Sequence, residues 1–359
     1  MRGVNHRKHN GEDQSIELAT APGFPIVTRI ALGQGPISAI VATPGDGRLM
    51  VANYGYDSVS VIDAHACRVV QTVAGLPEPF ALAVGRRDAN RAYVSTATAA
   101  YDAIDVIDLP TNTVISTHPL AFSLSDLAAS PDGDSVYASR NGAAGPDVVV
   151  LDTRTGGAEE IVLPGRPGTT TECVRSSADG SRLYVATNGP GGGQLVVIDA
   201  HAPASSRVLN TVEIGLPIRD LALSPDGATA YVASCAPELG AVIDSVDTWT
   251  AKIIGTSKIS EISGILTRLT LSRDGDRAYL VSDDGVTVLS THTHDVVGMI
   301  RVADEPSCVV ESTDARFLYI ADYSGAVTVV GTAAGAGSDS EPAAEWAVPE
   351  LLPAEPALA

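Results

Sequence analysis

A short pattern that recurs seven times along the chain sets the unit from which the fold must be built. Each copy joins a turn-forming stretch to an apolar run, and the clearest copies are SPDGDSVYAS (130–139), SADGSRLYVAT (177–187), SPDGATAYVAS (224–234) and SRDGDRAYLVS (272–282). Weaker copies begin at Thr43, Arg86 and Ser312. The equivalent residues of the apolar runs follow one another at steps of 43, 44, 47, 47, 48 and 40, and they are Met50, Tyr93, Tyr137, Tyr184, Tyr231, Tyr279 and Tyr319. A β-rich repeat of this length predicts units that pack only against their neighbours.

Each repeat is predicted to form four strands, A to D, so the chain is expected to be an all-β, seven-bladed propeller. The fifth repeat is typical, with strand A at 218–224 and an Asp-Gly turn at 226–227, where glycine supplies the positive φ that the turn requires. The Tyr-bearing run forms strand B, and strand D is a β-branched run such as 252–259. Strand C ends in an Asp that is expected to accept backbone N–H bonds at the C–D turn. These residues are Asp63, Asp108, Asp152, Asp199 and Asp247.

The two ends of the repeat array complement each other. The last repeat has strands A, B and C but no D, whereas residues 24–36 resemble a D strand with no A, B or C before it. We therefore expect Ile26–Leu32 to close the ring as the outer strand of the last blade. The predicted propeller spans residues 24–332. Residues 1–23, and the acidic Ala- and Pro-rich residues 333–359, are expected to be disordered.

Composition narrows the classes of function. The formal net charge of −20 repels phosphate backbones, so nucleic acid is not an expected partner. The four cysteines form no CxxC pair and are expected to be reduced and dispersed. Neither an apolar signal segment nor a run of 18 apolar residues is seen, which predicts a cytoplasmic protein with no membrane span. A monomer is expected. Export by a non-classical route is the alternative location.

Four strand-B segments carry a recognisable signature, namely YVST at Tyr93, YVAT at Tyr184, YVAS at Tyr231 and YIAD at Tyr319. Together with the Asp-Gly turns and the VID-type ends of strand C, they make residues 24–332 resemble the YVTN-repeat propellers, in particular the seven-bladed YncE-like proteins. The resemblance implies the fold but little about function, because many members of that family have no assigned activity. The chain departs from the pattern where Met50 replaces the first Tyr, and where Ser290 and Gly331 replace the strand-C Asp.

The direction of the strands sorts the loops onto two faces. The A–B and C–D turns lie on one face, and the longer, more varied B–C and D–A loops lie on the other, where strand A enters the channel. We expect a binding site at this channel mouth. A mixture of Arg, carboxylate and amide groups there suits a small polar or anionic ligand, although the same charges could simply pair across blades. The candidate ligand-binding residues are Asn53, Asp126, Arg140, Glu172, Asn188, Arg219, Asp220, Arg268 and Asp322.

Two classes of function follow. The favoured one is a non-enzymatic propeller that uses no cofactor and binds an unknown protein, a peptide or a small acidic ligand; one candidate is the chain's own acidic tail, with Glu341, Glu345 and Glu350 around Trp346. The alternative is a lactonase-like hydrolase of sugar-acid lactones or esters. It could hold a divalent cation on oxygens of Glu172, Asn188, Asp220 and Asp322, or work without metal through His, Arg and Glu. His118 is the only His expected near that face. The sequence contains no catalytic motif that decides between the two classes.

Overall fold

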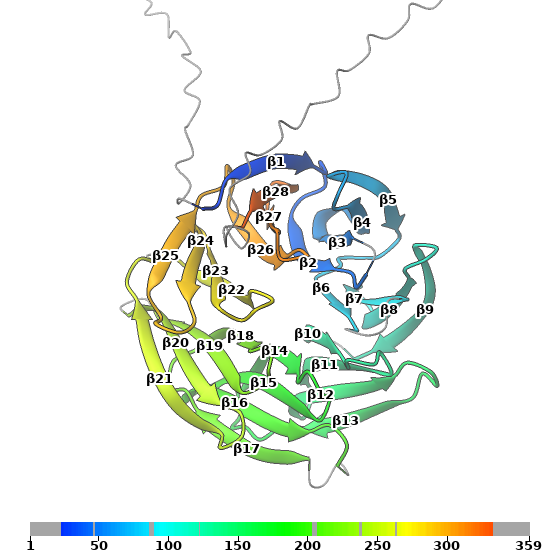
Figure 1. The fold of residues 1–359 in the computed structure, drawn as a ribbon. Coiled ribbons are helices and arrows are strands. Elements are labelled where there is room, and N and C mark those ends of the chain that lie inside the picture. The colour runs from blue at the N-terminus through cyan, green and yellow to red at the C-terminus, as the bar shows by residue number, and fades with distance from the viewer. Residues whose placement is uncertain are drawn as a thin grey trace, which may run out of the picture.

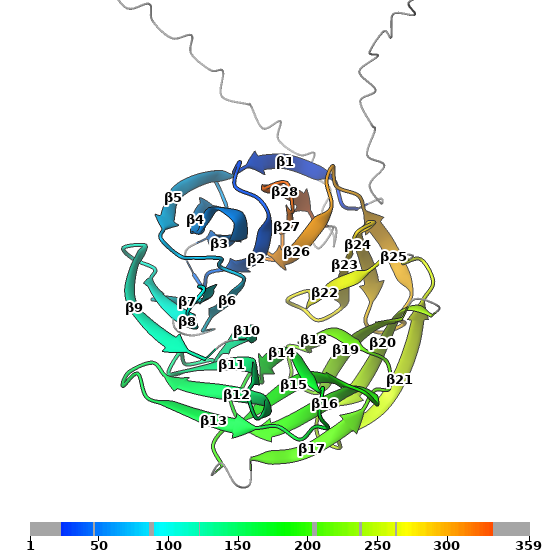
Figure 2. The same ribbon diagram turned by 180° about the vertical axis from the view of Figure 1, so that it is seen from behind.

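Seven antiparallel sheets surround a common axis in the computed structural model (Figure 1). The structure describes residues 23–332 except 46, 86–89, 122, 203–206, 237–238 and 263. Each sheet has four neighbouring strands, with strand A nearest the axis and strand D outermost, as both faces of the ring show (Figures 1 and 2). The predicted all-β, seven-bladed propeller is therefore confirmed.

Strands A to D of the first four blades follow one another along the chain. The first blade contains β2 (Ile37–Ala42), β3 (Arg48–Asn53), β4 (Ser58–Asp63) and β5 (Arg68–Ala74), with the short 3-10 helix η1 (Tyr54–Tyr56) between β3 and β4. The second contains β6 (Ala81–Val84), β7 (Arg91–Ala97), β8 (Asp102–Asp108) and β9 (Thr113–Leu120). The third contains β10 (Leu124–Ala129), β11 (Ser135–Gly142), β12 (Gly145–Asp152) and β13 (Ala158–Val162). The fourth contains β14 (Thr170–Ser176), β15 (Arg182–Gly189), β16 (Gly192–Asp199) and β17 (Val208–Glu213).

The remaining blades keep this order except at the closure of the ring. The fifth contains β18 (Ile218–Leu223), β19 (Thr229–Ala236), β20 (Gly240–Asp247) and β21 (Lys252–Ile259). The sixth contains β22 (Leu266–Leu271), β23 (Arg277–Ser282), β24 (Gly285–Ser290) and β25 (Val296–Ile300). The seventh contains β26 (Pro306–Glu311), β27 (Phe317–Asp322), β28 (Ala326–Gly331) and, as its outer strand, β1 (Ile26–Ala31).

The first strand of the chain closes the ring. β1 pairs antiparallel with β28, for example at Ile30 opposite Val327, so the last blade is completed from the other end of the sequence. Phe24, just before β1, is buried between the sixth and seventh blades, and the guanidinium of Arg277 lies 5.5 Å from the centre of its ring. The closure predicted from the complementary strand counts is therefore present. Residues 1–22 and 333–359 lie outside the described residues, and with them the expectations placed on the two termini and on Trp346.

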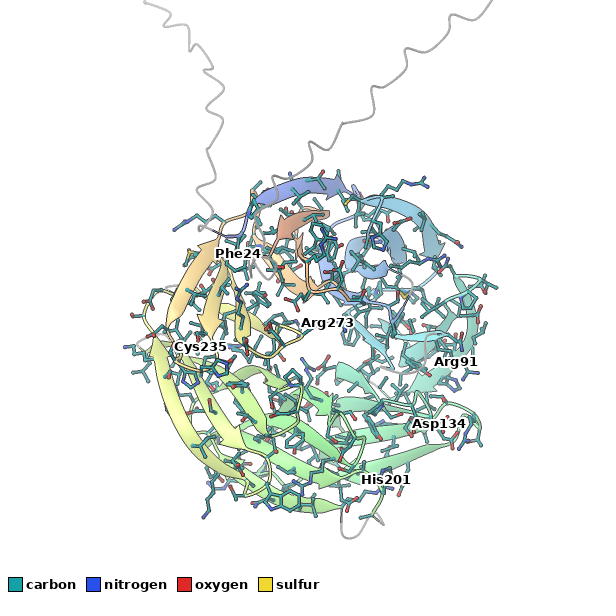
Figure 3. All side chains as sticks on the ribbon, viewed as in Figure 1. Phe24, Arg91, Asp134, His201, Cys235 and Arg273 are labelled. Atoms are coloured by element: carbon teal, nitrogen blue, oxygen red, sulfur yellow. The ribbon has the colours of Figure 1, made fainter. Side chains whose placement is uncertain are left out.

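The repeated Tyr residues fill the boundaries between blades. Tyr93 of the second blade packs among side chains of the third, and its hydroxyl donates to the Gly133 carbonyl at 3.0 Å. Tyr279 of the sixth blade likewise donates to Glu311 of the seventh at 3.1 Å. Met50 occupies the same position at the boundary between the first and second blades, where it packs among apolar side chains. An apolar residue of similar length can therefore replace Tyr there. Side chains fill the spaces between sheets all round the ring (Figure 3).

The Ser-x-Asp-Gly stretches form the A–B turns as expected. In the third blade the Ser130 hydroxyl donates to Asp132 at 2.6 Å and accepts from the Ser135 N–H at 2.9 Å, while Gly133 has φ +78°. The same Ser–Asp hydrogen bond recurs in the fourth to seventh blades, at Ser177, Ser224, Ser272 and Ser312. The seventh copy departs in one respect, because Ala315 adopts the positive φ that glycine adopts elsewhere.

The aspartates at the ends of strand C have the structural role predicted for them. Asp63 accepts the backbone N–H groups of His65 and Ala66, and these bonds lower the pKa of its carboxyl group. The equivalent residues Asp108, Asp152, Asp199 and Asp247 also accept backbone N–H bonds in their turns. The A–B turns lie closer to the axis than the C–D turns, as Arg273 and His201 illustrate (Figure 3). Within the described ranges, no helix is long and apolar enough to cross a membrane.

Candidate functional site

A pocket of about 440 Å³ opens where the seven A strands begin. One equivalent position near the start of every A strand lines it, so each blade contributes a side chain to the rim. These residues are Ser38, Phe80, Ser125, Glu172, Arg219, Thr267 and Ser307. Two of the hydroxyl groups join blades, as where Ser38 donates to the Pro79 carbonyl at 2.6 Å, and those of Thr267 and Ser307 donate to carbonyls of their own blades. The charged residues Glu172 and Arg219 are what distinguish this mouth pocket chemically.

A second space, of about 400 Å³, lies deeper along the A strands. Its wall carries Asp126 and Asp220, which occupy equivalent positions in the third and fifth blades, and Arg175 from the fourth blade between them. Arg175 donates to Asp220 at 2.5 Å and also pairs with Asp126. Asp220 is almost completely buried and accepts two backbone N–H bonds besides, one of them from Leu269 at 2.9 Å. One guanidinium thus holds three consecutive blades together inside the channel.

Arg268 of β22 lines both the mouth pocket and the deeper space. Burial lowers the pKa of its guanidinium, but the carboxylates of Asp220 and Asp126 outweigh that effect and the pKa is raised, so the group is always charged. Within the part of the chain that the structure describes, this guanidinium has no ion pair within 4.0 Å and no hydrogen bond. Arg175 therefore forms ion pairs with two carboxylates, whereas the N–H groups of Arg268 can donate to a ligand in the pocket.

Glu172 and Arg219 face the same pocket in the fourth and fifth blades. Neither forms an ion pair or a side-chain hydrogen bond with another described residue, and Arg219 is exposed. The alternative that mouth charges simply pair across blades therefore holds for Arg175 and its two aspartates, but not for Glu172, Arg219 and Arg268. An anion entering the pocket would meet two guanidinium groups that pair with no carboxylate of the described residues.

Arg140 does not share this opening, although the end of its strand is equivalent to the others. Its guanidinium is buried within the third blade, where it donates to Asp147 at 2.9 Å and to Glu160 at 2.6 Å. These partners lie on strands C and D, so the side chain extends outward through its own sheet. The expectation that Arg140 lines the mouth together with Arg219 and Arg268 is corrected by this geometry.

Three further candidates serve the framework. Asn188 bonds both backbone groups of Ile218, at 2.8 and 2.9 Å, and so joins the fourth blade to the fifth. Asn53 is fully buried and donates to Ser58 and Ser60 of its own blade. Asp322 accepts from Ser324 and from the Ala326 N–H, and pairs with Arg29 of β1 at 3.2 Å. Apart from the Oδ1 atom of Asn53, which is buried without a hydrogen-bond partner among the described residues, their side-chain groups bond to neighbouring loops and strands rather than to the pocket.

The groups proposed for catalysis are dispersed in the same way. Among the described residues, no three His, Cys, Asp or Glu side chains gather closely enough to hold a metal ion. Asn188, Asp220 and Asp322 each have separate protein partners, so they do not form a common ligand set with Glu172. His118 lies on the outer strand β9, bonded to Ser116 at 3.1 Å, and not near the mouth as expected.

The two channel cysteines are inert thiols in this setting. Cys173 and Cys308 occupy equivalent positions on β14 and β26, and neither is in a disulfide. Burial raises the pKa of Cys173 well above its usual value and that of Cys308 to about 11. Both therefore stay protonated near neutral pH, which disfavours thiolate chemistry in the channel.

Comparison with known proteins agrees with this fold. No family model matches the chain. Hydrazine synthase of Kuenenia stuttgartiensis superposes with a TM-score of 0.73 at 22% identity, covering 92% of this chain and 99% of that one. The β-propeller domain of Cps50 (Swd1) from Myceliophteria thermophila gives a TM-score of 0.71 at 14% identity, covering 86% and 99%. At such identities the likeness shows the fold alone.

A much closer relative exists in sequence. The seven-bladed β-propeller protein Rv1057 of Mycobacterium tuberculosis is 49% identical over 392 aligned positions, which cover 100% of this chain and 99% of that protein. The aligned positions span every blade and the closing strand. The chain therefore belongs to the family of seven-bladed β-propeller proteins that includes Rv1057.

Proposed function

We propose that the protein is a non-enzymatic propeller that binds a small acidic ligand in the mouth pocket. The observation that carries this proposal is Arg268, whose half-buried side chain lines the pocket with no carboxylate within 4.0 Å among the described residues. A cation in such a place is stabilised when a ligand carboxylate pairs with it, because burial removes part of its hydration. Arg219 on the neighbouring blade supplies a second guanidinium.

The size and the lining of the pocket favour a small molecule. A volume of about 440 Å³ lies within the range of ligand pockets in general. The rim combines the two arginines with the side chains of Phe80, Ile265 and Tyr323. A ligand with one or two carboxylates and a short carbon skeleton would satisfy both the charges and the apolar rim. Glu172 would disfavour ligands of high negative charge, which sets an upper limit on the number of carboxylates.

The resemblance to YVTN-repeat, YncE-like propellers is consistent with the fold, but it does not indicate which ligand the protein binds. The strand-B segments such as YVAT at Tyr184 are used at blade boundaries, away from the mouth. We therefore assign binding to residues outside the repeated signature, at strand-A positions where the blades differ from one another. Differences between repeats are where a symmetric scaffold acquires a specific site.

A thermal-shift screen of the full-length protein tests the proposal. The probes are acetate, succinate, citrate, gluconate and a tetraglutamate peptide, each in an amine buffer, with the matching amides as neutral controls. A ligand that binds only the folded state raises the melting temperature by mass action. We expect a rise with one or more acids and none with the amides. Equal shifts with acids and amides, or none at 10 mM of every acid, would refute an acid-binding mouth.

The lactonase alternative is tested in the same samples. Glu172 is the mouth carboxylate that has no partner among the described residues, so it is the side chain that a hydrolytic reaction would need. Proton release from gluconolactone, measured with and without Ca²⁺, separates the two classes. Release that exceeds the spontaneous rate and is lost in Glu172→Gln would favour the hydrolase over the binding protein.

A further inference from the structure

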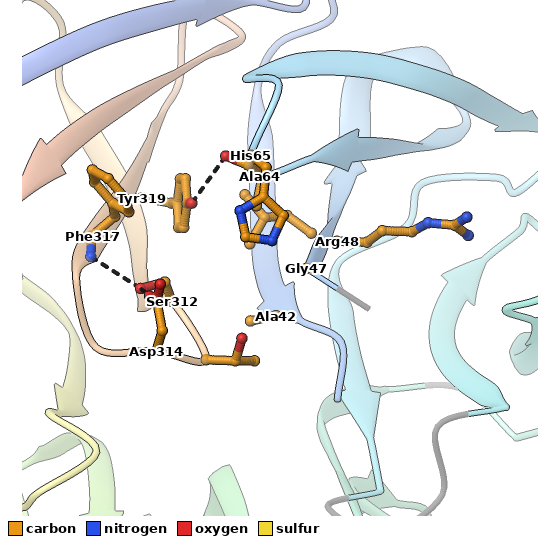
Figure 4. A pocket seen from close by; sticks show the side chains of 11 residues that line it. Ala42, Gly47, Arg48, Ala64, His65, Ser312, Asp314, Phe317 and Tyr319 are labelled. Carbon is orange, nitrogen blue, oxygen red and sulfur yellow. Dashed lines mark hydrogen bonds between the residues drawn. The ribbon is translucent and has the colours of Figure 1, made fainter. Parts of the chain in front are cut away.

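The face opposite the mouth carries two equivalent grooves that differ sharply in size. At the boundary between the seventh and first blades, His65, Phe317 and Tyr319 line a space of only about 20 Å³ (Figure 4). At the boundary between the fourth and fifth blades, Trp249, Arg182 and Tyr184 stand at the corresponding repeat positions, and the space is about 400 Å³. The first is room for a single water molecule, whereas the second admits a side chain of another molecule.

Trp249 is the unusual member of the larger groove. It is 83% exposed, although Trp has a large apolar ring. The sequence contains two Trp residues. Its place in the C–D turn, two residues after the end of strand C, does not require an aromatic residue, since five of the other blades carry His, Pro or Arg there. The equivalent residues are His65, Pro110, Arg154, His201 and His292. A large apolar ring that the turn does not need and the core does not bury indicates a surface that meets a partner.

Arg182 contacts the indole ring, and this contact shows that the ring can stack with a cation. The guanidinium carbon of Arg182 lies 5.4 Å from the centre of the Trp249 ring, within the range of cation–π attraction. Its Nη1 atom donates to the carbonyl of Thr248 at 2.7 Å, so the arginine is tethered to the backbone next to the indole. The ring is thereby held by a contact on one side while most of its surface stays open.

Three carboxylates line the same groove as this ring. Asp226 and Asp247 each use one oxygen inside their turns, with Ser224 and Thr250 respectively, and the second oxygen accepts no hydrogen bond from the described residues. Asp179 completes the lining. Among the described residues that line the groove, three side chains are negative and Arg182 alone is positive, a net charge of −2. Hydrogen bonds in the turns lower the pKa of all three carboxyl groups, so they stay ionised at neutral pH.

We propose that this groove, formed by Asp179, Arg182, Asp226, Asp247 and Trp249, docks a guanidinium or ammonium group of a basic peptide segment in a partner protein. The cation would stack on the open part of the indole and donate to the outer oxygens of Asp226 and Asp247. Charge complementarity selects this occupant, because an acidic segment would be repelled and a neutral one would leave the carboxylates unused. The site is independent of the mouth pocket, which lies on the opposite face.

A peptide titration in a Trp346→Phe background tests the proposal, because Trp249 is then the only tryptophan and its emission reports on the groove directly. The probe is fluorescein-labelled pentaarginine at 150 mM salt, followed by anisotropy. The matched variant is Trp249→His, which places here the residue found in three other blades. Tyr56→His, an exposed aromatic change on the mouth face, is the control.

We expect unlabelled pentaarginine to change the Trp249 emission. We also expect Trp249→His to weaken binding of the labelled peptide at least five-fold, with no change in Tyr56→His. General attraction to a chain of net charge −20 would affect all three proteins equally, so equal affinities would overturn the proposal. An emission unchanged by saturating pentaarginine would also overturn it, and that result does not depend on how any Trp249 variant folds. Equal responses to pentaglutamate or maltohexaose would rule out a cation site.

Discussion

Arg175 donates to Asp220 at 2.5 Å across the boundary between the fourth and fifth blades, and the same guanidinium pairs with Asp126 of the third blade. The channel wall is therefore cross-linked by charge at one level. Arg268, in the sixth blade, lines the same space without such a partner among the described residues. Two arginines of one channel thus have different roles, one in stability and one in the proposed binding site.

Replacing each of these arginines by Ala should separate the two roles. Arg175→Ala leaves two buried carboxylates without their counter-charge, so we expect a loss of roughly 3–5 kcal/mol in the free energy of unfolding. Arg268→Ala breaks no ion pair with a described residue and should cost much less. Urea denaturation of both variants measures the difference. Equal losses would show that Arg268 is also part of the framework.

Tyr184→Ala should destabilise the ring by about 3–5 kcal/mol, as large-to-small core substitutions do. The ring of Tyr184 is buried between the fourth and fifth blades, packed against Leu221 and Val232. Tyr101→Ala, which removes a partly exposed aromatic residue, is the control and should change stability by less than about 0.5 kcal/mol. A small effect at Tyr184 would mean that the blade boundary repacks around the missing ring.

Deleting residues 1–31 removes β1 and should leave the seventh blade with three strands. The edge of β28 would then be unpaired, and Phe24 would be lost from the boundary between the sixth and seventh blades. We expect a lower melting temperature and concentration-dependent aggregation, because an exposed strand edge pairs with other chains. Deletion of residues 1–22 alone keeps both features and is the control. A melting temperature that is the same in both deletions would refute closure of the ring by β1.

The A–B turns should contribute to stability in a pH-dependent way. Hydrogen bonds from Ser177 and Ser181 lower the pKa of Asp179 to about 2, below its unfolded value of about 3.9. A carboxyl group whose pKa is lowered on folding stabilises the protein above the unfolded pKa, and this stability is lost as the pH falls through the folded pKa. Asp179→Asn should therefore lower the urea midpoint at pH 7, and the difference from wild type should shrink between about pH 4 and pH 2. A difference that stays constant over that range would contradict this role.

The fold could be predicted from the sequence because its determinants are local and repeated. The hydrogen bonds of Ser130 and Asp132 span a few residues and recur in other blades, so the turns stand out as a pattern. The strand-B Tyr residues recur for the same reason, since every blade boundary presents a similar gap. Because the last repeat lacks its fourth strand, the unpaired β1 is expected to complete that blade as its outer strand.

The site could be predicted only in part, because the direction of a polar side chain depends on contacts between blades. Glu172, Arg219 and Arg268 line the mouth as expected, but Arg140 turns into its own sheet towards Asp147. Arg175 was missed, although a signal existed in the sequence. The other strands carry an apolar residue or Thr at its position, so a charge there marks a departure from the repeat. These residues are Val41, Ala83, Ala128, Ala222, Thr270 and Val310.

The most direct test of the proposed function is a calorimetric titration of the Arg219→Ala, Arg268→Ala double variant with the acid that gives the largest thermal shift in the wild-type protein. The control is the double variant Arg68→Ala, Arg154→Ala, which removes the same charge near the C–D turns of the opposite face. We predict that the mouth variant loses binding while keeping a wild-type circular dichroism spectrum, and that the control binds normally. Full affinity in the mouth variant, or equal loss in both, would contradict acid binding at Arg219 and Arg268.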